Sequence, residues 1–275
     1  LSLFMRRASR WLAALAALGA VGFTVAAAWM FFWVLPNIAE HRETVANLMS
    51  RALGQRVTIE SVTGAWQQAS PAFRLQGVRL YDKQDRLALN LPEVDATFAW
   101  RSLLFLEPRF TRIELQGLTL DVRRARDKHF YVGGIPVNPA DPDSGFSSWL
   151  LRQGRVHVGT ATLNWLDEVR DAPPLMLEAV DLTLINARRT HNLKLHAIPP
   201  AGVARPLTIE AELTARDVDD IKTWSGVIEA KVAGVSFPRL APWLQLPYQP
   251  RQGWGALHVN FSVAQGALAE IRAGL

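Results

Sequence analysis

The feature that most limits how this chain can fold is a run of 25 residues without a charged side chain, from Trp11 to Leu35. As an α-helix with a rise of about 1.5 Å per residue, this run is longer than the hydrocarbon core of a bilayer, which is about 30 Å thick. Trp29 and Trp33 lie near its far end and Trp11 at its near end, where aromatic side chains favour the interface with water. The run therefore predicts a transmembrane helix over residues 11–35.

The charges before this run predict its orientation. Arg6, Arg7 and Arg10 precede it, and no acidic residue occurs before Glu40. By the positive-inside rule, residues 1–10 form a basic cytoplasmic tail and the rest of the chain lies in the periplasm, anchored in the inner membrane. The alternative is a cleaved signal peptide, whose apolar region has only about 7–15 residues. The length of this run favours an uncleaved signal-anchor.

The remaining charges argue against a nucleic-acid partner. Once the three N-terminal arginines are set aside from the 30 basic side chains, 27 remain against 25 acidic ones. Such a domain lacks the one-sided basic surface of a phosphate-backbone binder. Cysteine is absent, so the chain has no disulfide and no thiolate metal site.

Residues 36–54 predict an amphipathic helix that links the membrane to the domain. Ile38, Val45, Met49 and Leu53 recur at helical spacing, and Gly54 is suited to end the helix. Two arrangements are open: the helix packs on the first strands, or it lies on the membrane surface. We favour packing on the strands, because the polar face is mixed in charge rather than rich in lysine and arginine.

Beyond Gln55 the apolar residues alternate with a period of two. Runs of this kind, separated by Gly, Pro, Asn and Asp, predict a mainly β domain over 55–275 built as a long antiparallel sheet with a few short helices. The loop-like sequence near 133–146 marks an internal boundary. Alternation continues up to Leu275, so we expect the domain to continue beyond this sequence.

A short unit recurs within these strands: an apolar residue, any residue, a small residue, and then apolar, any, apolar. Its small residue is Gly77, Gly117, Thr160 or Ala179. A spacing of three across the small residue breaks strict alternation. A β-bulge or tight bend there would return both halves of the unit to one face of the sheet.

The strands present more apolar surface than the few short helices can cover. A second sheet, a membrane or an apolar ligand remains as a covering, because large uncovered apolar surface usually marks an interaction site. A sandwich packed on itself is the structural alternative.

The order of several segments resembles a known family. These segments are ALGQRVTIESVTGAW (52–66), FRLQGVRLYD (73–82) and SSWLLRQGRVHVGTATLNW (147–165). Together they resemble the AsmA-like proteins of the Gram-negative envelope, and in particular the N-terminal portion of the YhdP branch. One departure is Lys128, where a turn glycine is expected. The resemblance implies a half-pipe-shaped β-groove lined by apolar side chains, with a role in moving phospholipid between the inner and outer membranes.

We expect the groove to contact phospholipid acyl chains through apolar positions aligned by the short unit and its neighbouring strands. These positions are Leu75, Leu80, Leu89, Leu115, Leu118, Leu120, Leu163 and Leu182. The inner membrane and outer-membrane or periplasmic proteins are further expected partners. A second hypothesis is a periplasmic scaffold that binds proteins through strand edges and assists outer-membrane biogenesis.

Enzymatic chemistry has little support in the sequence. There is no nucleotide-binding, hydrolase or metalloprotease motif, so we expect no catalytic residue, no metal and no cofactor. The six histidines show no ligand spacing, and we expect them to be solvated on exposed strand faces. The tryptophans of the outer domain are expected to pack in the core and at its rim rather than to stack on a ligand.

Overall fold

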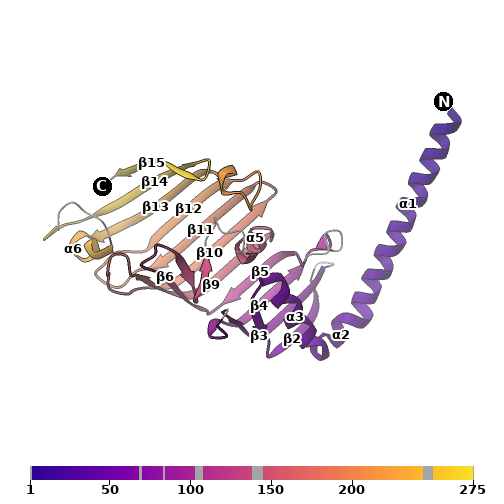
Figure 1. Ribbon diagram of the computed structural model, residues 1–275, viewed down its shortest axis with the longest axis horizontal. Coiled ribbons are helices and arrows are strands. Elements are labelled where there is room, and N and C mark those ends of the chain that lie inside the picture. Colours follow the sequence, from indigo (N-terminus) through magenta and orange to yellow (C-terminus); the bar gives the residue numbers. More distant parts are fainter. Residues whose placement is uncertain are drawn as a thin grey trace.

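The computed structural model describes residues 2–67, 70–82, 84–102, 108–137, 145–243 and 250–274. A long helix projects from one end of a broad twisted sheet (Figure 1). The helical part comprises α1 (Ser2–Trp29), a π-helical turn η1 (Met30–Val34), α2 (Leu35–Asn37), a 3₁₀ turn η2 (Ile38–His41) and α3 (Arg42–Leu53). The π turn directly precedes Pro36, whose ring has no N–H and disturbs the regular helical bonding of the preceding turn. Within the described residues, one helical stretch is long and apolar enough to cross a membrane.

In the described part of the chain, fifteen strands form one open sheet. Their order is β1-β3-β4-β5-β9-β10-β11-β12-β13-β14-β15, with β2 paired to β3 and with β6, β7 and β8 attached beside β9. The strands are β1 (Arg56–Thr58), β2 (Ser61–Gln67), β3 (Ser70–Tyr81), β4 (Leu87–Phe98), β5 (Phe110–Gln116), β6 (Thr119–Arg124), β7 (Phe130–Val132), β8 (Ile135–Val137), β9 (Arg155–Asp167), β10 (Leu175–Ala187), β11 (Thr190–Ile198), β12 (Leu207–Thr214), β13 (Ser225–Ser236), β14 (Trp254–Ala264) and β15 (Ala267–Gly274). This confirms the predicted fold class, and a sandwich of two packed sheets is not what the described residues form.

One junction in the sheet is parallel, although the alternation had predicted antiparallel pairing throughout. Both β5 and β6 run parallel to β9. A parallel pair needs a long crossover, and residues 125–154 supply it with β7, β8 and α5 (Gly145–Leu151). The boundary predicted near 133–146 falls in this crossover, although residues 138–144 lie outside the described residues.

The predicted bends in the strands are confirmed. Gly77, Gly117, Thr160 and Ala179 all have a positive φ, of 60°, 64°, 50° and 46°. The strand register shifts beside Thr160 and Ala179, between Leu177 and Val180. Because Gly117 also bonds through its N–H to the carbonyl of Gly159, these bends lie side by side across neighbouring strands as a crease in the sheet. Lys128 likewise has a positive φ of 69° and occupies the turn position where a glycine was expected.

Two helices, α3 and α5, cover the N-terminal half of the sheet, whereas in the described part of the other half the short helix α6 (Phe237–Leu240) places the Phe237 ring against Gly253 and Gly255 at the start of β14. The apolar side chains of α3 and of α5 pack into one cluster with buried residues of β1 to β5, β9 and β10, including Val62, Val78 and Val156. At Gly64 of β2 a Cβ would lie 3.0 Å from the carbonyl oxygen of Leu35, so glycine allows the link between α1 and α3 to approach the sheet closely. α3 thus packs on the strands, as we favoured from its mixed polar face.

Candidate functional site: an uncovered apolar face

The register of β10 to β15 builds continuous apolar rows on one side of the sheet. Leu182 pairs with Leu195, which pairs with Ile209, and the row continues through Ala230 and Val259. A second row runs in parallel through Leu184, Leu193, Ala211, Ile228, Phe261 and Ile271. Directly opposed residues point to the same face of a sheet. The two rows therefore form an apolar track that crosses the strands.

The opposite face of the same strands is charged and polar. Lys194 and Glu210 form an ion pair of 3.0 Å between β11 and β12. Glu229 of β13 accepts hydrogen bonds from Lys231 and from His258 of β14, which hold the pKa of its carboxyl below the usual value. Most charged side chains of these strands thus lie on the face opposite the apolar track, although Val227 and Ile185 are also exposed on that charged face.

The apolar track loses its covering along the sheet. Leu184 and Leu193 still belong to the cluster under α3 and α5. A second cluster contains only residues of the sheet and its connections, centred on Leu118, Ala161 and Val180. From Ile209 onward, the apolar residues of the track belong to neither cluster. Ala211 is buried, Ile209, Ile228, Val259 and Phe261 are half-buried, and Ile271 on β15 is 56% exposed. Exposure of the track is therefore greatest towards β15.

All eight predicted groove residues lie on the apolar side of the sheet, in the two clusters. Leu75, Leu80 and Leu89 are buried beneath the helices, and Leu118 is buried within the second cluster. The other four, Leu115, Leu120, Leu163 and Leu182, are half-buried. Whether any of them contacts lipid stays a prediction.

Sequence reasoning did not single out the part of the track outside the two clusters. Ile209, Ile228, Val259 and Phe261 lie in runs recognised as strands, but these runs lack the short unit used to align the groove residues. The signal that was available is the plain alternation in LTIEAELT (207–214) and ALHVNFSV (256–263). Both runs pair with β13, which contains Ile228, and this pairing brings the four residues onto one face.

A buried hydrogen-bonded pair, His191 and Asn186, lies at one end of the part of the sheet that α3 and α5 cover. His191 is 3% exposed and stacks on Trp224, with ring centroids 5.0 Å apart. Asn186 donates to the carbonyls of Leu150 and Gln153 at the end of α5, so its oxygen accepts the Nδ1–H of His191 at 2.7 Å. Burial lowers the pKa of His191. The prediction that all the histidines are solvated was therefore wrong for this residue, because the crossover folds α5 against its strand end.

A group of ion pairs lies at the C-terminal ends of β6 and β9, where Asp167 contacts Arg124 and Arg170. Asp167 is fully buried and accepts from Arg124 Nε at 2.8 Å and from Arg170 Nη1 at 3.1 Å. Burial alone would raise the pKa of Asp167, but the two arginines outweigh it and hold the pKa below the usual range. With both partners in place, this carboxylate is a structural anion and not a proton donor at neutral pH.

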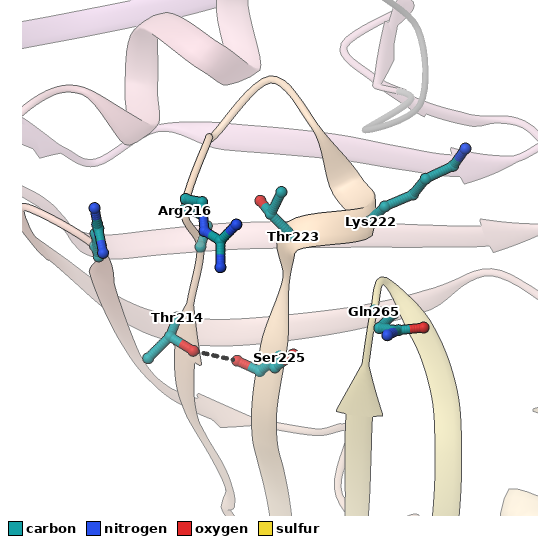
Figure 2. A pocket seen from close by; sticks show the side chains of 8 residues that line it. Thr214, Arg216, Lys222, Thr223, Ser225 and Gln265 are labelled. Atoms are coloured by element: carbon teal, nitrogen blue, oxygen red, sulfur yellow. Dashed lines mark hydrogen bonds between the residues drawn. The ribbon is translucent and has the colours of Figure 1, made fainter.

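A cationic pocket of about 460 Å³ lies where the turns after β10, β12 and β14 meet (Figure 2). Arg189, Arg216 and Lys222 contribute its charge, and none of them forms an ion pair with another described residue. Thr214 and Ser225, joined by a 3.1 Å hydrogen bond, line it from the polar face of the sheet. The pocket therefore does not open onto the apolar track. Among the described residues, no group of histidines and carboxylates is arranged to hold a metal ion.

A comparison with protein families matches residues 4–275 to the family described as YhdP protein. The chain belongs to the YhdP family. No curated protein and no solved structure matched the chain. YhdP membership confirms the resemblance drawn from the segment order, and it covers both the apolar helix and the sheet.

The long apolar helix of this YhdP family protein carries its aromatic residues on the surface. Trp11, Trp29 and Trp33 are 72%, 57% and 51% exposed. The arginines expected to set the orientation, Arg6, Arg7 and Arg10, lie in the first turns of α1, in a stretch whose side chains are not described. An exposed apolar helix of this kind fits a lipid surrounding and disfavours water.

Proposed function

We propose that this YhdP family protein is a non-enzymatic lipid conduit. It is anchored in the inner membrane by α1 with its N-terminus in the cytoplasm, and it carries phospholipid along the apolar track of its periplasmic sheet towards the outer membrane. The observation that supports this best is the part of the track from Ile209 onward, which lies outside both clusters and faces away from a charged opposite side. Nucleic acid has no place in this function, whereas outer-membrane or periplasmic proteins would receive the lipid.

The chemistry of the track suits acyl chains. Each methylene removed from water contributes about 0.8 kcal/mol, so a chain lying on the track is held firmly. Neighbouring strands are about 4.8 Å apart, and each step from Leu195 to Ile209 to Ala230 exchanges one apolar contact for another of similar energy. A charged headgroup would remain at the open side, because burying it without a partner is costly.

The test is photo-crosslinking of the whole protein in cells. A photoreactive amino acid at Ile209 or Phe261 should capture phospholipid, while the same probe at Glu210 or Asn260, the next residue on the opposite face, should not. Equal capture on both faces, or none on either in a folded protein, would refute the conduit. Capture of protein rather than lipid at Ile209 would favour the alternative, a scaffold for outer-membrane assembly.

A further inference from the structure

A chain of aromatic rings joins the anchor helix to the near end of the sheet. The ring of Phe23 in α1 meets Trp100, with centroids 5.0 Å apart, and Phe31 meets Trp66 at 5.3 Å. Trp66 and Trp100 stack on each other at 6.0 Å, and Phe98 lies at 6.4 Å from Trp100. Trp66 is at the end of β2 and Trp100 follows β4, so the β2–β3 and β4–β5 hairpins end against α1.

The position of Phe23 along α1 gives the depth of these ring contacts in the hydrocarbon core of the membrane. Counting from Trp11, the first residue after the arginines, about 20 helical residues cross a hydrocarbon core of about 30 Å. The apolar crossing then ends near Met30, and Phe23 lies seven residues, or about 10 Å, inside it. An ordinary tilt of about 20° changes this depth little. The ring of Trp100, beside Phe23, is at the same depth.

The backbone near the described ends of both hairpins is hydrogen-bonded, as a position within the hydrocarbon layer requires. Backbone polar groups must be bonded internally where water is absent. The β2–β3 pairing extends to Gln67 and Ser70, at the end of the described part of that hairpin. In the other hairpin, Ala99 N–H bonds to the carbonyl of Arg109 at 2.9 Å, and Ser102 both donates to and accepts from the backbone of Arg109, at 2.8 and 2.9 Å.

Two arginines lie at this aromatic end. Arg101 is exposed and directly follows Trp100, and Arg109 is bonded through its backbone to Ala99 and Ser102. A long arginine side chain can keep its stem in the apolar layer while its guanidinium reaches the headgroups. Trp66 and Trp100 carry large apolar rings, whose burial among acyl chains removes much apolar area from water.

We propose that the described parts of the β2–β3 and β4–β5 hairpins that contact α1 are embedded in the membrane leaflet that surrounds the outer half of α1, with Trp66 and Trp100 among the lipid acyl chains. The partner of this surface is the phospholipid leaflet itself. This inference rests on α1 being a membrane anchor, as in the proposed function. It adds that the sheet begins inside the leaflet. A phospholipid could then diffuse laterally within the leaflet onto the apolar side of the sheet, and its acyl chains would not pass through water.

The absence of cysteine makes a site-specific depth measurement straightforward. The whole chain, reconstituted in phosphatidylcholine vesicles, would carry one environment-sensitive fluorophore on Gln67→Cys or on Arg101→Cys. The matched control is Gln84→Cys, an exposed glutamine in the β3–β4 turn. The 12-residue strand β3 separates the two glutamines, which is about 40 Å at about 3.3 Å per residue. Val21→Cys in α1 reports the anchor itself.

Labels on Gln67→Cys and Arg101→Cys should be quenched by nitroxides on the lipid acyl chains and protected from aqueous iodide, whereas the label on Gln84→Cys should behave in the opposite way. If Val21→Cys is quenched by the lipid nitroxides while both hairpin labels match Gln84→Cys, the anchor stands and the embedded hairpins are wrong. If Val21→Cys is also accessible to iodide, the anchor and hence the proposed function fail together.

Discussion

The crease in the sheet gives the most direct test of how the fold is built, through the substitution Gly77→Ala. Gly77 and Gly117 have nearly the same φ, 60° and 64°, so alanine at either position meets the same backbone penalty. Holding a non-glycine residue in this conformation costs about 1–2 kcal/mol. The surroundings differ: a Cβ on Gly77 would lie 2.4 Å from the carboxyl carbon of Glu60, whereas a Cβ on Gly117 would meet nothing within 4 Å.

The two alanine variants should therefore lose different amounts of stability. Gly117→Ala should lower the free energy of unfolding by about 1 kcal/mol through its backbone alone. Gly77→Ala should lose about 1 kcal/mol more, because Glu60 must swing away from its ion pair with Arg79, and an exposed pair contributes at most about 1 kcal/mol. Ala179→Gly, at another bend with a φ of 46°, should change stability in the opposite direction.

The measurement is urea unfolding of the whole chain in detergent, followed by far-ultraviolet circular dichroism of the sheet. The control is the single variant Glu60→Ala, which removes both the clash and the ion pair. In the Glu60→Ala background, Gly77→Ala should cost only about as much as Gly117→Ala, because the backbone penalty is all that remains. Equal losses for Gly77→Ala and Gly117→Ala in the unmodified chain, or a larger loss for Gly77→Ala than for Gly117→Ala in the Glu60→Ala background, would refute this account of the crease.

Two further predictions concern the buried polar groups. Arg124→Ala should destabilise the protein by about 2–4 kcal/mol because it leaves buried Asp167 with Arg170 as its main partner, whereas Arg126→Ala, which breaks the exposed pair with Asp171, should cost less than about 1 kcal/mol in the same urea titration. Burial lowers the pKa of His191, so the folded state resists the proton that the unfolded state takes up, and stability should fall as the pH drops below about 6.5. His191→Gln should reduce this fall between pH 7.5 and 5; an unchanged pH dependence would show that His191 does not cause it.

Local rules were enough to predict the strands and their bends. The alternation in residues 55–275 specified which side chains share a face, and the small residue in each short unit marked where that alternation is interrupted. Gly77 and Gly117 show the expected backbone, and even Thr160 and Ala179, which carry a Cβ, adopt it. Steric limits on φ operate within a few residues, so a single sequence displays them.

Long-range features escaped the sequence. The sequence from Phe110 to Gln116 contains no signal for its parallel pairing with the strand that begins at Arg155. That pairing in turn folds α5 against the strand ends and buries His191, which looked solvated from its neighbours alone. The part of the track outside the two clusters was missed for a related reason, since Ile209 and Phe261 come together only through pairing of strands far apart in the chain.

From β10 to β15, every strand pairs with the strand that precedes it in the chain. Each new strand therefore needs only the edge left by the last one, and apart from the connection between β13 and β14 the loops that must close are short, which favours rapid folding. A chain that emerges from the ribosome N-terminal end first can assemble this part of the sheet in the order of synthesis. The same rule makes the length of the track easy to change during evolution, because an added hairpin extends the apolar rows without disturbing the strands already in place.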